Sequence, residues 1–444
     1  MSLAVPPRDP DVSARRLLVL SVPAIVVGVV SALVLWALDQ LAAALEGLLW
    51  DTVPGALGID ASGWWIVVVL TTTGLAVGVA LTFMPGHGGP DSATTELVEE
   101  PLPMRALPGL ALVTLLGLAG GVSLGPENPI IAINVAIIVT IFARLLPQVP
   151  ARISMLLAAS ATIGALFGTP VAAALIFTGI VAAVKAGGSL WDRLFLPVAA
   201  AGAGATTMHL LGAPPFAFEL PPYGTPQTID FLTGSIVACG AAVIGLAALA
   251  AFPVVYRALH ALRHPIIIAT VGGFVLGLLG LIGGPITMFK GLEQIGELLE
   301  NVDDYSAAQL AAIAGIKIVA LLVAASALFR GGRVFPATFI GVALGLLGYA
   351  LIPGLPLALA VGCGVLGIVL VVTRDGWIAL FVAVAISGDF TTLPVLCVIV
   401  LPVWLLVSGA PEFRIEPAQP PGQGDPAGGA RTSGSPAPDG ETAR

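Results

Sequence analysis

Apolar stretches long enough to cross a lipid bilayer recur along this chain of 444 residues. A transmembrane helix needs about 20 predominantly apolar residues, and the runs 17–38, 66–83 and 231–253 are of this kind. Hydrophobic residues make up 57% of the sequence and charged residues only 10%, whereas soluble domains carry about 25% charged residues. The sequence therefore predicts an all-α polytopic membrane protein.

Charge and composition divide the chain into three parts. Arg15 and Arg16 precede an apolar run that is too long for a signal-peptide core, so they indicate a short cytoplasmic segment, 1–13, before a first transmembrane helix. The membrane domain is expected to span 14–410. From 411 to 444 the sequence is rich in Pro, Gly and Ser and poor in large apolar residues, which is typical of a disordered tail. Both termini are expected on the cytoplasmic side.

Many of the apolar segments are short and interrupted by Gly or Pro. Broken helices are tolerated at membrane depth where they line a cavity or lie buried in protein, and in transporters they mark the binding site and recur in two halves of a repeat. Breaks at 125–129 and 331–336 favour such a repeat. Short apolar segments are also predicted at 90–98 and 284–299.

Three glycine-rich breaks precede apolar helices and carry the candidate anion-binding residues. A helix that begins inside the membrane presents free backbone N–H groups, which attract anions. A carboxylate at membrane depth is costly and indicates a functional site, and Glu127 lies in the second break. The breaks comprise Gly86, His87, Gly88, Gly89 and Pro90; Gly125, Pro126, Glu127, Asn128 and Pro129; and Gly332, Arg333, Val334, Phe335 and Pro336.

In this order the three breaks resemble the signatures of the CLC chloride channels and transporters. The first is similar to that family's G-S-G-I-P motif, the second to G-K/R-E-G-P and the third to G-G-x-F-x-P, and the resemblance covers about 14–410. It implies a CLC-like inverted repeat of tilted and broken helices, and a homodimer with one anion pathway in each subunit. It also implies chloride or a similar small anion as the partner, in the plasma (inner) membrane of a prokaryote.

The resemblance assigns Glu127 as the gating glutamate, whose carboxylate occupies an anion site until it is protonated or displaced. The alternative is a neutral glutamic acid bonded to a neighbouring backbone group. His87 stands in place of a coordinating serine, so either its ring donates an N–H to the anion or it faces an aqueous vestibule. Arg333 either draws anions in or points to solvent or an acidic partner. Phe413 matches a family tyrosine but lacks the hydroxyl.

One missing carboxylate bears on the mechanism. Family members that exchange an anion for a proton usually carry an internal glutamate, and the matching position here falls near Gly179 or Ile180, in a run (170–184) with no carboxylate. Proton transfer through a dry interior needs a titratable relay or a water wire. We therefore expect an uncoupled chloride channel. The alternatives are a proton-coupled chloride antiporter, or a conductor of another anion such as nitrate or fluoride.

Other classes of function find little support in the sequence. An intramembrane enzyme would show clustered catalytic groups, and the metalloprotease pattern H-E-x-x-H does not occur. An organic-solute carrier would need a more polar pocket. Lys317, within an apolar helix, is expected to snorkel or to pair at an interface. No enzyme activity, cofactor, metal site, disulfide framework or nucleic-acid partner is expected; the cysteines that lack paired spacing are Cys239, Cys363 and Cys397.

Overall fold

A computed structural model describes residues 14–95, 99–183, 189–213, 216 and 218–415. The predicted segment 1–13 and the tail from 416 onward lie outside this part. Within it the regular structure is helical, and eight helices are long and apolar enough to cross a membrane. The predicted class, an all-α polytopic membrane protein, is confirmed.

The helices follow the chain in two sets. The first set is α1 (Ala14–Gly47), α2 (Val53–Leu57), α3 (Trp65–Phe83), α4 (Leu107–Ala119), α5 (Glu127–Leu145), α6 (Ala151–Phe167), α7 (Pro170–Ala183) and α8 (Leu190–Leu210). The second set is α9 (Thr228–His260), α10 (Pro265–Gly283), α11 (Leu292–Glu300), α12 (Ala307–Ser326), α13 (Val334–Leu351), α14 (Leu357–Thr373), α15 (Gly376–Ser387) and α16 (Leu393–Val407).

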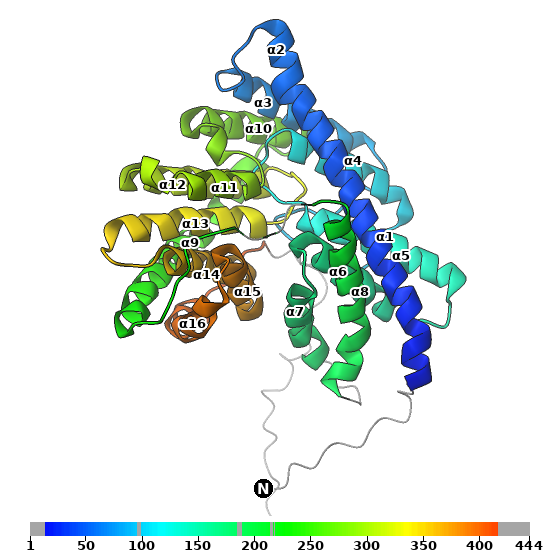
Figure 1. The fold of residues 1–444 in the computed structure, drawn as a ribbon. Coiled ribbons are helices and arrows are strands. Elements are labelled where there is room, and N and C mark those ends of the chain that lie inside the picture. Colours follow the sequence, from blue (N-terminus) through cyan, green and yellow to red (C-terminus); the bar gives the residue numbers. More distant parts are fainter. Residues whose placement is uncertain (1–13, 96–98, 184–188, 214–215, 217, 416–444) are drawn as a thin grey trace, which may run out of the picture.

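The two sets repeat one packing scheme. In the first set α5 packs on α6, α6 packs on α7 and α8, and α1 packs on α4, α6 and α8. In the second set the matching contacts are those of α13 with α14, of α14 with α15 and α16, and of α9 with α12, α14 and α16. The sets lie on opposite sides of the molecule, and the loops that lead into α5 and α13 meet between them (Figure 1). The expected two-fold repeat is therefore present as a packing pattern.

Helices α3 and α10, one from each set, make close contact with each other through glycine. A Cβ atom added at Gly74 would lie 2.2 Å from the carbonyl oxygen of Ala269, and one added at Gly273 would lie 2.2 Å from that of Leu70. Small residues at such a contact let the backbones of two membrane helices approach closely, and the van der Waals packing that results helps to hold helices together in lipid. This contact fastens the two halves together beside the central loops.

A reciprocal pair of hydrogen bonds marks the junction of the two halves. The N–H of Gly125 donates to the carbonyl of Gly332 at 2.9 Å, and the N–H of Gly332 donates to that of Gly125 at 2.7 Å. Each glycine lies two residues before the helix that follows it, α5 or α13, and four residues before a proline, Pro129 or Pro336. This shared Gly-x-x-x-Pro pattern is visible in the sequence, and it is the signal that could have predicted the pairing of the two glycines.

Three sequence expectations need correction. Residues 90–95 form turns and not a short helix, because Asp91 accepts hydrogen bonds from the following residues; residues 96–98 lie outside the described part. In the segment 284–299 the helix begins only at Leu292, after a short 3₁₀ turn. Residues 411–415, which were expected in the tail, pack against the helical part of the protein, because Phe413 is buried and the N–H of Ile415 donates to the carbonyl of Ala93.

Candidate functional site

The carboxylate of Glu127 lies at the N-terminus of another helix. Glu127 begins α5 and is only 1% exposed. Its Oε1 accepts a hydrogen bond of 2.9 Å from the backbone N–H of Phe335, the second residue of α13. The N-terminal turn of a helix carries free N–H groups and partial positive charge, so it is a natural anion site. In this structure the side chain of Glu127 fills that site.

Two glycines leave the space that the carboxylate occupies. A Cβ atom added at Gly125 would lie 2.1 Å from Oε2 of Glu127, and one added at Gly332 would lie 2.2 Å from the same atom. These are the two glycines whose backbones pair at the centre of the molecule. Oε2 itself is buried and has no hydrogen-bond partner among the described residues. The backbone pairing of the two halves therefore builds a cradle that fits one carboxylate group.

A cavity lies on each side of this carboxylate. One, of about 330 Å³, is lined by Asn128, Arg333 and Val334; we call it the Arg333 cavity. The other, of about 290 Å³, is lined by Pro126, Phe335 and Lys290; we call it the Lys290 cavity. The residues directly before and after Glu127 therefore each line a different cavity, and so do the first two residues of α13, Val334 and Phe335.

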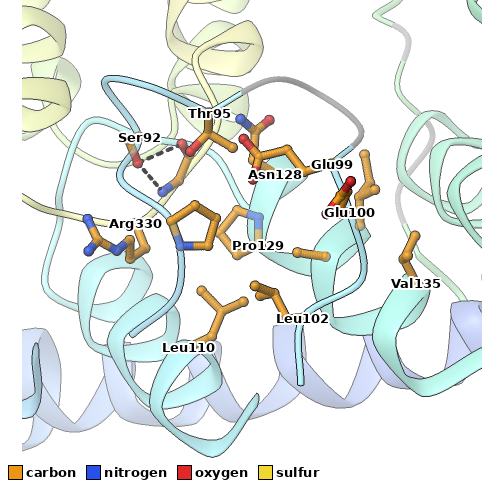
Figure 2. A pocket seen from close by; sticks show the side chains of 14 residues that line it. Ser92, Thr95, Glu99, Glu100, Leu102, Leu110, Asn128, Pro129, Val135 and Arg330 are labelled. Atoms are coloured by element: carbon orange, nitrogen blue, oxygen red, sulfur yellow. Dashed lines mark hydrogen bonds between the residues drawn. The ribbon is translucent and has the colours of Figure 1, made fainter. Parts of the chain in front are cut away.

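The first glycine-rich break is tied to the third. The Ser92 hydroxyl donates to the carbonyl of Phe329 at 2.7 Å and accepts from the N–H of Gly331 at 2.8 Å. Arg330 forms an ion pair with Asp91 at 3.4 Å and donates from Nε to the carbonyl of Gly88 at 3.1 Å. Ser92, Arg330 and Asn128 line one small pocket (Figure 2), whose volume of about 20 Å³ has room for one water molecule. The three breaks thus converge, although they are spread over about 250 residues of the chain.

His87 does not lie with the Glu127 group. Its side chain is exposed, and its Nδ1 lies 3.0 Å from the carbonyl of Leu81 in α3. The chain around it turns through left-handed conformations, with φ of 79° at Gly86, 49° at His87 and 66° at Gly88. His87 was expected either to donate a ring N–H to the anion or to face an aqueous vestibule. This geometry favours the second interpretation, in which the ring does not contact the anion.

Phe413 and Arg333 come together in the Arg333 cavity. The ring of Phe413 is buried and stacks on Phe252 with centroids 4.7 Å apart. The guanidinium of Arg333 lies 5.5 Å above the same ring, within the range of a cation–π interaction. The ring of Phe413 therefore lines the cavity as expected. It has no hydroxyl, and the guanidinium of Arg333 lies beside it. Arg333 is not directed simply to solvent, because its Nη2 donates to the carbonyl of Thr95 at 3.1 Å.

Aromatic rings pack around Phe335, which also lines the Lys290 cavity. Phe335 stacks on Phe167 at 5.9 Å and meets Phe216 edge-on at 5.5 Å, and Phe381 packs edge-on against Phe167 at 5.6 Å. These rings come from α13, the end of α6, residue 216 and α15. Because all four are apolar, they offer no group that could carry a proton away from Glu127.

Lys317 stabilises the wall of the Lys290 cavity. Its side chain is fully buried, and its Nζ donates to the carbonyls of Thr287, Met288 and Phe289 at 3.1, 2.6 and 2.8 Å. An ammonium group has three N–H donors, and all are used here. Of the two expected placements of Lys317, snorkelling and pairing at an interface, the structure agrees with the second, because the loop before Lys290 brings carbonyl acceptors to its ammonium group inside the protein. Sequence spacing gave no sign of this contact.

Replacing Lys317 by methionine should destabilise the fold. The substitution keeps the apolar stem but leaves three buried carbonyls without their donor, and each buried unsatisfied group costs about 1–3 kcal/mol. We expect the free energy of unfolding to fall by at least about 2 kcal/mol, seen as a lower midpoint of thermal unfolding in detergent. The control is Lys290→Met. Lys290 lies three residues after Thr287, and its side chain is partly exposed. Equal midpoints for the two variants would contradict this role.

A helical bundle of membrane-spanning segments, with broken helices meeting at its centre around an anion site, defines a membrane ion-transport protein. The chain belongs to the voltage-gated chloride channel (CLC) family, whose model matches residues 73–405. It is 48% identical over 414 residues to the "Putative ion-transport protein YfeO" of Escherichia coli (strain 55989 / EAEC), a match that covers 92% of this chain and 98% of that protein. The same protein from Escherichia coli O9:H4 (strain HS) is 47% identical over 415 residues.

Two solved structures show the same fold. A CLC-type fluoride/proton antiporter superposes with a TM-score of 0.74 at 19% identity, covering 90% of this chain and 98% of its own. A slow cyanobacterial Cl⁻/H⁺ antiporter superposes with a TM-score of 0.71 at 16% identity, covering 88% of this chain and 95% of its own. The predicted CLC-like architecture is therefore confirmed.

Proposed function

We propose that this protein conducts chloride or a similar small anion along a pathway gated by the side chain of Glu127. The observation that supports this most strongly is the position of the carboxylate, which fills the N-terminal anion site of α13 between two cavities. A carboxylate held in this way blocks the site with a negative charge of its own. A transported anion reaches the site only when the carboxylate leaves it.

Protonation provides the physical means of opening. A neutral carboxylic acid loses most of its attraction for the N–H of Phe335, because hydrogen bonds that involve a charged partner are about twice as strong as neutral ones. An anion that arrives from either cavity then competes for the same N–H group. The site offers backbone dipoles and no full positive charge in direct contact, so the anion binds without being trapped.

We further propose that the flow is uncoupled from proton movement. The run 170–184 contains no carboxylate, and the aromatic cluster of Phe167, Phe216, Phe335 and Phe381 lines one side of the junction with apolar rings. The second candidate is proton-coupled exchange, which is favoured by the two solved neighbours, both of them antiporters. Exchange would require water to carry protons to Glu127.

A liposome experiment separates these candidates. Purified protein is reconstituted in chloride-loaded vesicles, and chloride efflux and internal pH are followed together, with and without a potassium ionophore. Chloride efflux that needs the ionophore and moves no protons against their gradient supports the uncoupled channel. Proton movement driven by the chloride gradient would establish exchange, and the absence of any chloride, nitrate or fluoride flux would contradict the proposed function.

We also propose a membrane topology and an oligomeric state for the protein. We place both termini on the cytoplasmic side of a prokaryotic inner membrane, since Arg15 and Arg16 lie just before the first span. We also propose a homodimer with one pathway in each subunit. Labelling of a cysteine introduced at either terminus would check the position of the termini. Crosslinking in native membranes would check the homodimer.

A further inference from the structure

Ser92 lies just after the first glycine-rich break, but its hydroxyl binds the backbone of the third. Its Oγ accepts the N–H of Gly331 at 2.8 Å, and it lies within donating distance of the carbonyls of Gly331, at 3.0 Å, and Phe329, at 2.7 Å. The side chain of Ser92 is buried. A hydroxyl can donate one hydrogen bond and accept two, so this single group reaches both the N–H and the carbonyl of Gly331.

Gly331 directly precedes the cradle that holds the carboxylate of Glu127. Gly332 exchanges two backbone hydrogen bonds with Gly125, and a Cβ atom added at Gly332 would lie 2.2 Å from Oε2 of Glu127. The backbone groups of Gly332 are thus bound by Gly125, and those of Gly331 by the hydroxyl of Ser92. Glycine loses more conformational freedom on folding than any other residue. Two successive glycines therefore need these partners to keep one conformation.

Free space adjoins the hydrogen bonds of Ser92. Ser92 and Gly331 both line the small pocket drawn in Figure 2, which has room for one water molecule. Elsewhere Gly331 is tightly packed, because an added Cβ atom would lie 2.5 Å from Cβ of Leu124 and 2.8 Å from the carbonyl oxygen of Gly125. Without the hydroxyl, the segment of Gly331 and Gly332 has space to shift toward the pocket. Such a shift loosens the cradle.

The position of Ser92 is fixed by its two neighbours in the chain. The carboxylate of Asp91 forms an ion pair with Arg330 at 3.4 Å. The carbonyl of Ala93 accepts the N–H of Ile415 at 2.8 Å. Ser92 therefore has a rigid base from which it holds the third break.

We propose that Ser92 is a positioning residue of the gate. Its hydroxyl keeps Gly331 and Gly332 in the conformation that closes the cradle around the carboxylate of Glu127. Ser92 acts through the two glycines and not by contact with the carboxylate or with the transported anion. The inference rests on the proposed function, because it takes Glu127 as the gate.

Chloride efflux from liposomes measures the effect of removing this hydroxyl. Ser92→Ala should raise efflux by about two- to tenfold, since a neutral hydrogen bond changes an equilibrium constant by that factor. In the Glu127→Ala background the same change should have no further effect, because the cradle is then empty. Ser92→Thr, which keeps the hydroxyl, should stay near the wild-type rate. Ser92→Cys, whose thiol forms only weak hydrogen bonds, should fall between the threonine and alanine variants.

Ser387→Ala is the matched control. The hydroxyl of Ser387 is also buried and donates to the carbonyl of Val384 at 2.9 Å, at the end of α15, and its loss should leave efflux unchanged. Wild-type efflux in Ser92→Ala, an equal rise in both backgrounds, or a Ser92→Thr protein as active as Ser92→Ala would each overturn the proposal. If Ser92→Ala does not fold, Ser92→Cys carries the same comparison in both backgrounds. Unchanged efflux in Glu127→Ala would instead reject the gate itself, so the two failures are distinguished.

Discussion

Replacing Glu127 with alanine should raise anion flux and remove most of its dependence on pH. The charged hydrogen bond to the N–H of Phe335 is worth about 1.5–3 kcal/mol, so its loss should favour the open site by roughly ten- to a hundredfold. In the wild type, flux should rise as pH falls, because protonation weakens the same bond. In Glu127→Ala there is no carboxyl group to protonate, so the curve of flux against pH should be nearly flat.

Glutamine and a second carboxylate provide the controls for this result. Glu127→Gln keeps the shape of the side chain and mimics the protonated acid, so it should also be open at neutral pH. Glu293→Gln removes a carboxylate that lines the Lys290 cavity away from the helix junction, and should leave the pH dependence in place. Chloride efflux from liposomes should be measured for all three variants at pH values on both sides of the usual pKa of a glutamate, about 4.3. A wild-type flux and pH response in Glu127→Ala would remove this residue from the gate.

The substitution Gly332→Ala should open the pathway without touching Glu127 itself. The added Cβ would lie 2.2 Å from Oε2, 2.5 Å from the carboxyl carbon and 3.0 Å from Cβ of Glu127. The backbone of Gly332 lies outside the left-handed region, so alanine is acceptable there and the side chain of Glu127 is what must move. We expect flux to rise to nearly the level of Glu127→Ala, by roughly tenfold, because the same charged bond is lost.

A double variant makes this expectation sharper. If both changes empty the same cradle, Gly332→Ala combined with Glu127→Ala should conduct no more than either single variant, since groups that share one interaction are not additive. Gly117→Ala, in α4, meets nothing within 4 Å and controls for the exchange of glycine for alanine in a membrane helix. A Gly332→Ala protein that folds, transports at the wild-type rate and keeps its pH dependence would show that Glu127 is not held in this cradle.

Much of the helical architecture could be predicted from the sequence, because in lipid the apolar pattern leaves few choices. The apolar runs at 66–83 and 231–253 are found within the helices Trp65–Phe83 and Thr228–His260. The expectation failed at 90–95, where Asp91 organises turns that hydropathy does not reveal. It also failed at Phe413, which is buried although Glu412 and Arg414 flank it, so hydropathy assigns this segment to the tail.

Hydropathy and the three glycine-rich motifs were sufficient to predict a polytopic helical membrane protein of the CLC family. They also pointed to Glu127, because an isolated carboxylate between apolar segments is costly. Tertiary structure alone decided what that carboxylate touches. Gly125 and Gly332 pair across about 200 residues of chain, Lys317 meets three carbonyls of a distant loop, and Arg333 reaches the ring of Phe413. These contacts depend on how the two halves pack. Apart from the Gly-x-x-x-Pro pattern that the two glycines share, local hydropathy and spacing carry no information about contacts of that range.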